Sequence, residues 1–309
     1  MSSHLGKNIK PGEYKKNSEK MNHHILISLR KVFGFHSFKA FQKEIVQTII
    51  KGHDIFAIMP AGAGKSLCYQ LPAYLLQGTC IVVSPFVSKM KDQADSAITN
   101  GLKADYLNGT QTEKERGYVF TGLKSESLDL LYISPEYFVK NAFLNIIKHI
   151  KICLFVADEA HCISEWSPGF IPKYRTCSKI FYSFPDIPLA AFTATATHKV
   201  QLDIINRLKI KLTNIIRTSF NRSNLVYRVI PKDDINKQIL DIVKKHPNQS
   251  GIIFRTTIKS VENTVNLLTK CNIKALPLHE ALSDKSKKDN LKMFNHDKVP
   301  VIATTMAFR

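Results

Sequence analysis

Short apolar runs alternate along this chain with longer segments in which apolar residues recur at helical spacing. A short, continuously apolar run is typical of a strand that is buried on both faces of a parallel sheet. In the first two thirds of the chain, such runs occupy residues 55–59, 80–84, 128–134, 152–157 and 189–193. Because helical segments separate them, the pattern predicts an α/β lobe built on a parallel sheet.

A second series of apolar runs begins after a polar segment at residues 218–224. It comprises residues 225–231, 251–255, 275–278 and 299–304. We therefore predict a basic, disordered tail over residues 1–24, a first α/β lobe over residues 25–218, and a second lobe over residues 219–309. We expect the second lobe to be partial, because the sequence given stops soon after its last predicted strand.

A glycine-rich segment, Met-Pro-Ala-Gly-Ala-Gly-Lys-Ser at residues 59–66, joins the first predicted strand to a predicted helix. This strand–loop–helix context is that of a phosphate-binding loop. Gly62 and Gly64 permit a tight turn with inward-facing N–H groups, and the helix start adds its positive end. Lys65 would then reach the β- and γ-phosphates of a nucleotide, and the Ser66 hydroxyl would bind Mg²⁺. The alternative is a glycine-rich turn with an incidental lysine, which this context disfavours.

A second candidate motif, Asp-Glu-Ala-His at residues 158–161, follows the predicted strand at residues 152–157. Acidic groups at the carboxyl end of a parallel strand point into the crevice where such sheets bind ligands. Asp158 would hold the Mg²⁺ that bridges the phosphates, and Glu159 would orient and deprotonate the attacking water. His161 completes the motif, so with Lys65 these residues are the catalytic candidates. Alone, the motif also fits a solvated strand end; the phosphate loop before it favours nucleotide hydrolysis.

The chain is strongly basic, with 44 lysines and arginines against 25 acidic residues and a net charge of +19. Such an excess favours a polyanionic partner. An AT-rich genome, whose codons favour lysine, is the alternative origin of the charge, and the two explanations are compatible.

Six cysteines are scattered without a C-x-x-C pair. This distribution indicates reduced thiols, no disulfide framework and no zinc site, and hence an intracellular protein. It would be cytoplasmic or nucleoid-associated in a bacterium, and nuclear in a eukaryote. No apolar run approaches the roughly 20 residues of a membrane span, so no membrane partner is expected.

With both nucleotide motifs placed, residues 25–308 resemble the RecQ family of superfamily 2 DNA helicases. The resemblance implies two RecA-like lobes of the P-loop NTPase type, the second incomplete. The segment at residues 29–42 resembles the family's adenine-reading motif. It implies that Phe35 stacks on adenine, that the Gln42 amide reads the edge of the base, and that Lys39 stands where the family usually has arginine. We expect Phe38 to pack in the core instead. The same resemblance includes Ala63 among the nucleotide-binding positions.

Further segments resemble family motifs that contact DNA. Residues 82–93 resemble a strand-contact motif, residues 162–166 the start of an aromatic loop, and residues 191–197 the segment that couples hydrolysis to DNA. Residues 251–255 and 279–284 resemble second-lobe motifs. The DNA-binding candidates implied are Ser84, Pro85, Lys91, Gln93, Trp166, Phe170 and Thr195. The expected ligands are ATP with Mg²⁺, and single-stranded or forked duplex DNA.

The chain also departs from the family pattern. In the aromatic loop, Ser167-Pro-Gly169 replaces Gly-His-Asp and Ile171 replaces arginine, so polar couplers are absent. Ala63 replaces a glycine in the phosphate loop, where its Cβ is expected to strain the backbone. No Q-x-x-G-R-x-G-R segment occurs.

Because that arginine segment is absent, we expect the 309-residue chain to bind ATP, to hydrolyse it slowly, and not to unwind DNA. The resemblance favours an ATP-dependent 3′→5′ DNA helicase. A catalytically impaired ATP- or DNA-binding remnant is the alternative, and an RNA helicase is less favoured.

Overall fold

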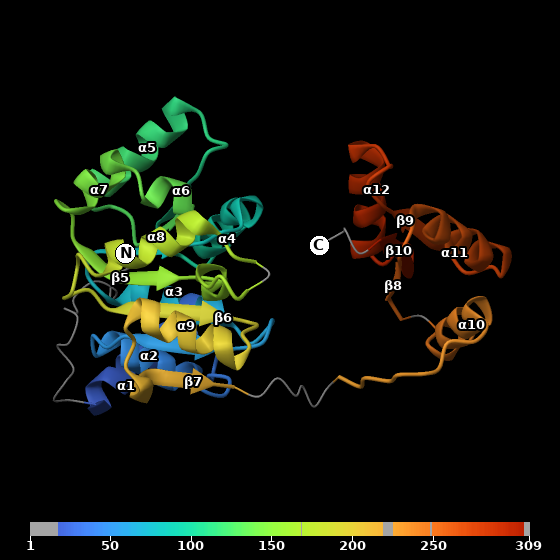
Figure 1. Cartoon of the computed structure of the whole chain (residues 1–309), viewed down its shortest axis with the longest axis horizontal. Helices are drawn as coiled ribbons and strands as arrows, with labels where there is room; N and C mark the ends of the chain where they lie inside the picture. Colours follow the sequence, from blue (N-terminus) through green and yellow to red (C-terminus); the bar gives the residue numbers. More distant parts are fainter. Residues whose placement is uncertain (1–17, 168, 219–224, 248, 306–309) are drawn as a thin grey trace. The chain divides into compact units, whose positions relative to one another are not determined.

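The computed structural model describes residues 18–167, 169–218, 225–247 and 249–305 (Figure 1). It divides the chain into two compact units, residues 1–223 and 224–309. The predicted boundary between the lobes, after residue 218, lies five residues before this division. Each unit is an α/β domain built on its own parallel sheet, as the apolar pattern predicts.

A seven-stranded sheet forms the centre of the first unit. Its strand order is β3-β4-β2-β5-β6-β1-β7, and every pairing is parallel. The strands are β1 (Ile55–Ile58), β2 (Thr79–Val83), β3 (Ala104–Leu107), β4 (Leu130–Ile133), β5 (Ile152–Ala157), β6 (Leu189–Thr193) and β7 (Ile215–Arg217). Because β5, β6 and β1 are neighbours, the loops that follow them meet at one edge of the sheet.

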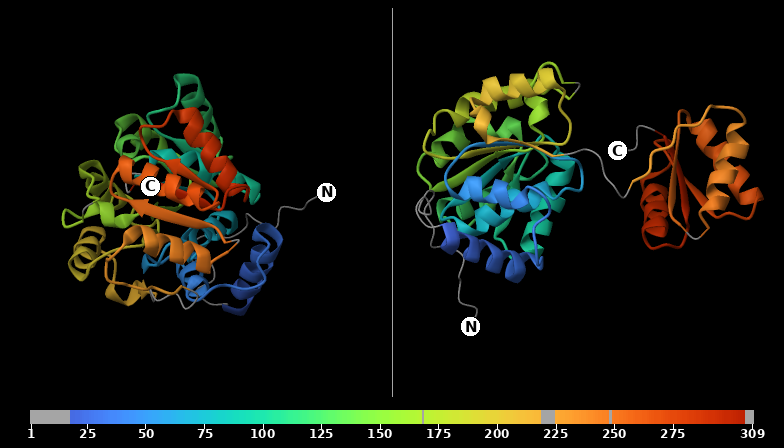
Figure 2. Two further views of the ribbon diagram at one scale, coloured as in Figure 1. Left: turned by 90° about the vertical axis from the view of Figure 1, so that its right-hand side faces the viewer. Right: turned by 90° about the horizontal axis from the view of Figure 1, so that it is seen from below.

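Helices cover both faces of this sheet, seen edge-on in Figure 2. One face carries α1 (Ser18–Phe33), α2 (Gln42–Ile50), α3 (Lys65–Leu75) and α4 (Val87–Thr99). The other carries α5 (Glu113–Lys124), α6 (Pro135–Phe138), α7 (Asn141–Ile147), α8 (Pro172–Phe181) and α9 (His198–Leu208). Short 3₁₀ turns occupy Ala160–Ile163 and Leu212–Asn214. Among the described residues, no helix is both long and apolar enough to cross a membrane.

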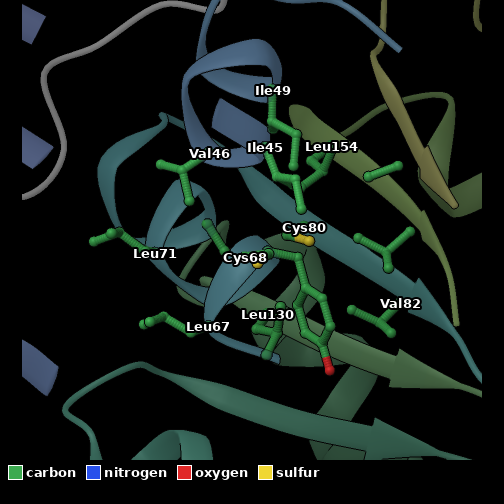
Figure 3. Close-up of a cluster of buried hydrophobic side chains, with 14 of the residues drawn as sticks. Ile45, Val46, Ile49, Leu67, Cys68, Leu71, Cys80, Val82, Leu130 and Leu154 are labelled. Atoms are coloured by element: carbon green, nitrogen blue, oxygen red, sulfur yellow. The ribbon is translucent and has the colours of Figure 1, made fainter. Parts of the chain in front are cut away.

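Each central strand contributes side chains to two separate cores. On β2, Cys80 and Val82 pack beneath α2 and α3, whereas Ile81 and Val83 face the opposite core. Figure 3 shows the first of these cores, with side chains of α2 and α3 lying against Cys80, Val82 and their neighbours. Successive strand residues point to opposite faces, which explains why the central strands are continuously apolar.

Two strands of the first unit escape sequence prediction. β3 reads Ala-Asp-Tyr-Leu and β7 reads Ile-Ile-Arg, and both lie at the edges of the sheet. Edge strands are short and partly exposed, so they lack the continuous apolar signature of the central strands. Their pairing with β4 and β1, respectively, makes them strands.

The predicted tail over residues 1–24 is wrong for its last part. Helix α1 begins at Ser18, so residues 18–24 are helical, and the Met21 side chain is buried in the core. Met21, Ile25 and Leu29 recur every four residues and therefore share one helix face. Residues 1–17 lie outside the described part of the chain.

The second unit is smaller and has three parallel strands in the order β8-β10-β9. These are β8 (Gly251–Arg255), β9 (Ala275–Leu278) and β10 (Val301–Thr305), accompanied by α10 (Ile235–Lys245), α11 (Ile258–Lys270) and α12 (Asp284–Asn295). Leu268, Ala275 and Val301 form its buried core.

The strand predicted at residues 225–231 is wrong. This segment has no regular structure, and Tyr227 and Val229 are exposed. An apolar run becomes a strand only when a neighbour accepts its hydrogen bonds, and no described strand pairs with this one.

All six cysteines are free thiols, and only Cys271 is not fully buried. Burial raises the pKa of the Cys68 thiol to about 12. Burial, together with the negative charges of Glu159 and Asp158, also raises the pKa of Cys162 to about 12. These thiols therefore stay protonated at neutral pH and behave as core residues.

Candidate functional site

The phosphate loop has the backbone that its glycines predict. Gly62 and Gly64 adopt φ values of 77° and 78°, in the region that favours glycine. A Cβ on Gly64 would also collide with the Nε2 atom of Gln42. Helix α3 begins at Lys65 without a side-chain cap. Because no capping side chain occupies its first N–H groups, they can bind an anion.

The strain expected at Ala63 is absent. Ala63 is not among the residues of positive φ, and its N–H donates to the carbonyl of Pro60 at 3.2 Å. Its side chain packs partly against the core below α3. Since the two flanking glycines take the left-handed conformations, alanine between them adopts an ordinary one.

The acidic motif lies one strand away from the phosphate loop on the same edge of the sheet, because only β6 separates β5 from β1. Glu159 adopts a left-handed conformation (φ 49°) directly after Asp158. Its carboxylate lies 3.5 Å from Lys65 Nζ and 3.4 Å from His161 Nδ1. The structure therefore brings together three of the four predicted catalytic side chains by direct contact.

Asp158, the fourth, is buried and accepts a 3.4 Å hydrogen bond from the Ser84 hydroxyl. Burial and the neighbouring Glu159 raise its pKa, although Lys65 acts in the opposite direction. Burial would also raise the pKa of Glu159, but the bond to His161 and the charge of Lys65 outweigh it, so that pKa is lowered. Glu159 is thus held ionised, while the ionised form of Asp158 is disfavoured without a further cation.

This difference fits a Mg²⁺ site. A buried carboxylate whose charge is poorly compensated gains stability when a divalent cation binds it. Magnesium prefers oxygen ligands, and a helix-start hydroxyl with a carboxylate is the set that Ser66 and Asp158 supply. The described residues contain no separate cluster of histidine, cysteine and acidic side chains suited to a metal.

Two of the residues expected to bind the base, Gln42 and Lys39, contact the phosphate loop. Gln42 is buried, and its Nε2 donates to the carbonyls of Ala63 and Gly64 at 3.0 and 3.3 Å. Its Oε1 accepts from the backbone N–H of Lys39 at 2.9 Å, and Lys39 Nζ donates to Gly62 O at 3.4 Å. To read adenine, the Gln42 amide must exchange at least one loop contact, because both of its Nε2 hydrogens are engaged.

Phe35 remains free to stack, since 52% of its surface is exposed. It lines a cavity of about 550 Å³ that also contacts Gly64 and Ser66 of the phosphate loop. Phe38, by contrast, packs against the core below α3, as expected.

The DNA-binding candidates divide into buried and exposed residues. Ser84 is buried and its hydroxyl donates to Asp158, so its side chain is part of the acidic site. Pro85 and Gln93 are half-buried, and Lys91 is exposed. Trp166 is exposed and Phe170 is half-buried, and both follow the acidic motif. Thr195, which follows β6, is exposed.

Two residues that sequence reasoning missed hold the site together. Thr193, at the end of β6, contacts His161 Nδ1 at 2.9 Å and donates to the carbonyl of Thr195 at 3.0 Å. Tyr174, on α8, hydrogen-bonds through its hydroxyl to the carbonyls of Val83 (2.8 Å) and Asp158 (2.6 Å). Thr193 lay within a recognised motif, but no local signal marks Tyr174, which meets β2 and β5 only in the folded chain.

Two family descriptions match this chain. The DEAD/DEAH box helicase family matches residues 39–203, and the helicase conserved C-terminal domain matches residues 232–309. Solved structures that resemble it include Saccharomyces cerevisiae dbp5 (TM-score 0.67, 15% identity, 92% of this chain and 73% of that chain). Another is the Pyrococcus furiosus Hef helicase domain (TM-score 0.62, 14% identity, 90% and 87%). At these identities the likeness shows the fold, two RecA-like helicase lobes.

Sequence relatives are more specific. ATP-dependent DNA helicase RecQ of Pasteurella multocida is 37% identical over 280 residues, covering 91% of this chain and 44% of the relative. The Bacillus subtilis protein of the same name is 36% identical over 290 residues, covering 93% and 49%. RecQ-like DNA helicase BLM of Xenopus laevis is 38% identical over 291 residues, covering 90% and 21%.

The chain thus spans less than half of the length of these relatives. Its phosphate loop and acidic motif both lie inside the matched region, and the two bacterial relatives are named ATP-dependent DNA helicases. The chain belongs to the DEAD/DEAH box helicase family, and over most of its length it is homologous to RecQ helicases.

Proposed function

We propose that this chain is the ATP-driven motor part of a RecQ-type DNA helicase that unwinds DNA in the 3′→5′ direction during repair and recombination. One observation carries the proposal: Lys65, Glu159 and His161 meet beside the buried Asp158 at the sheet edge that follows a glycine phosphate loop. The names of the sequence relatives support DNA as the nucleic acid. An intracellular location is part of the same proposal.

In this mechanism, the phosphate loop and the start of α3 bind the triphosphate of ATP through backbone N–H groups. A Mg²⁺ held by Ser66 and Asp158 would neutralise charge on the phosphates. Lys65 exchanges its 3.5 Å contact with Glu159 for the incoming phosphates, which frees the Glu159 carboxylate to orient the attacking water. His161 and Thr193 then hold Glu159 and the end of β6 in one hydrogen-bonded series.

The nucleic-acid side of the proposal is supported by charge and by exposed aromatic groups. A net charge of +19 favours binding to a phosphate backbone. The exposed indole of Trp166 and the half-buried ring of Phe170 offer faces on which bases stack. Single-stranded DNA and forked duplexes are the substrates that this combination favours.

Nucleotide hydrolysis can be tested with three purified proteins: the native chain, Lys65→Ala and Glu159→Gln. We expect Lys65→Ala to lose ATP binding, and Glu159→Gln to bind ATP and Mg²⁺ without hydrolysing it. Lys124→Ala is the matched control, because Lys124 is exposed at the end of α5 and outside the site. Unchanged ATP affinity in Lys65→Ala would overturn the assignment of this loop.

Unwinding is tested on duplexes with 3′ or 5′ single-stranded tails, in DNA and in RNA. The proposal predicts that the full-length protein opens 3′-tailed DNA, and that the 309 residues alone bind both ATP and DNA. Preference for RNA would favour an RNA helicase. ATP and DNA binding without hydrolysis in the full-length protein would favour a binding remnant.

A further inference from the structure

The exposed Trp166 carries a cation on its ring. The Lys199 ammonium lies 3.1 Å from the ring centroid, well within the roughly 6 Å range of a cation–π contact. Nevertheless, 57% of the Trp166 surface remains exposed. An indole covered on one face by a single ammonium therefore still presents a large apolar surface to solvent.

The two partners of this contact come from different elements, each anchored separately. In the segment before Trp166, Glu165 forms an ion pair with Arg175 of α8, and the backbone N–H of Trp166 donates to Ser164 Oγ at 3.3 Å. Lys199 lies in the first turn of α9, which Thr197 caps by accepting from the N–H of Val200 at 3.4 Å. The cation–π contact thus joins the loop after the acidic motif to the start of α9.

Residues 164–171 contain no lysine or arginine of their own. A cation on the indole must therefore come from elsewhere in the fold, and α9 supplies it. Stacking of a base requires an aromatic ring in a fixed orientation, and a ring that is already held loses less conformational freedom when the base binds. Lys199 contacts one face of the ring, and 57% of the Trp166 surface remains exposed.

We propose that Lys199 is a positioning residue for Trp166, holding the indole so that a base of single-stranded DNA stacks on its free face. This inference rests on the proposed function, because it takes DNA to be the ligand of this loop. Lys199 acts through the ring, so its contribution to DNA affinity disappears when the ring is removed.

A double-mutant cycle with an oligothymidine probe tests this dependence. Trp166→Ala is expected to weaken binding by about 5- to 150-fold, the loss of one stacked base. Lys199→Ala is expected to weaken it by about 2- to 5-fold in the native background, and not at all in the Trp166→Ala background. Lys199→Arg should retain affinity, since a guanidinium also stacks on indole.

A matched control lies at the other end of the same helix. Lys209, at the end of α9, has its ammonium 4.5 Å from the centroid of the Tyr182 ring. Lys209→Ala removes one cation and one cation–π contact but leaves Trp166 untouched. It should therefore leave base stacking unchanged, whatever its general electrostatic effect.

Fluorescence provides a second readout, because Trp166 is the only tryptophan in the chain. Without DNA, Lys199→Ala should shift the emission, whereas Lys209→Ala should not; identical emission in all three proteins would overturn the contact. With DNA, Lys199→Ala could lower DNA affinity equally in the native and the Trp166→Ala backgrounds. That result would make Lys199 an independent phosphate contact and overturn its positioning role. If Lys199→Ala shifts the emission but DNA does not quench Trp166 in the native protein, both this role and DNA binding by the loop are overturned.

Discussion

The two units of this chain use the same architecture with very different degrees of burial. In the first unit, every residue of the central strands β1, β2, β4, β5 and β6 is buried between two layers of helices. In the second unit, alternate residues of β8 are exposed, with Ile252 and Phe254 at 55% and 56%. No described residue of α10 or α12 is fully buried.

The candidate catalytic residues lie at the more deeply buried sheet of the first unit, and not at the smaller sheet of the second. The predicted catalytic side chains all follow strands of the first unit, whose two cores fix the position of each strand end. A site for phosphoryl transfer needs such fixed positions, because its groups act by orientation and charge. The second unit has a small buried core, so its free energy of unfolding is expected to be lower than that of the first unit.

The largest effect should come from the site itself. We expect Lys65→Ala to lower ATP affinity by roughly 100-fold or more, since a bound triphosphate is left without its nearest cation. The fold of the first unit should survive, because the Lys65 ammonium pairs with Glu159 in the site and Lys65 is not one of the buried core residues. Isothermal titration with ATP, and circular dichroism for the fold, measure the two outcomes. A loss of fold would show that the site and the core are not separable.

Next in size is a core substitution in the second unit. Leu268→Ala removes the side chain that contacts Ala275 and Val301 and should lower the free energy of unfolding by about 2–5 kcal/mol. Hydrogen exchange should then show the second unit opening while the first stays protected. Ile252→Ala is the control, because an exposed side chain contributes little to a core. Loss of protection in both units would contradict their independence.

A smaller effect is expected at Tyr174. Tyr174→Phe removes the hydroxyl that bonds to Val83 and Asp158 and leaves buried carbonyls short of a donor, lowering the free energy of unfolding by about 1–3 kcal/mol. Tyr182→Phe is the matched control, because the Tyr182 hydroxyl is buried without a hydrogen-bond partner among the described residues. Thermal denaturation compares them, and equal shifts would argue against the bridging role.

The smallest effects concern two helix caps, one in each unit. Thr257 caps α11 with Ser260, whereas Thr112 caps α5 with Glu115, whose carboxylate accepts from the Thr112 N–H and hydroxyl. Thr257→Ala should cost about 0.5–2 kcal/mol at any pH, since neither partner titrates.

The α5 cap should instead weaken in acid. Hydrogen bonds from Thr112 lower the pKa of Glu115 below its usual 4.5. A lowered pKa stabilises the folded state above pH 4.5, and this contribution is lost as the pH falls through the folded value. The destabilisation caused by Thr112→Ala should therefore shrink in acid, while that of Thr257→Ala should not. Thermal melts between pH 7 and pH 3 measure both, and parallel curves would contradict the role of Glu115.

Sequence reasoning succeeded where a local pattern carries the physical cause. The strands β1, β5 and β6 are continuously apolar because both faces are covered, and Gly62 and Gly64 stand where the backbone turns left-handed. It failed at the edges: β3 and β7 were missed, and residues 225–231 were assigned a strand that they do not form. Pairing is a property of neighbours distant in sequence, so apolar spacing alone cannot decide it.

For the site, the sequence by itself determined the chemical groups: a lysine and a hydroxyl after a glycine loop, and two acids and a histidine after a buried strand. Only the tertiary structure decided their partners, because β5, β6 and β1 become neighbours only in the folded sheet. That adjacency brings Lys65 to Glu159 and Thr193 to His161, and the pairing of β2 with β5 brings Ser84 to Asp158. Local sequence sets which groups a chain carries, whereas long-range strand order sets the distances that give those groups a common function.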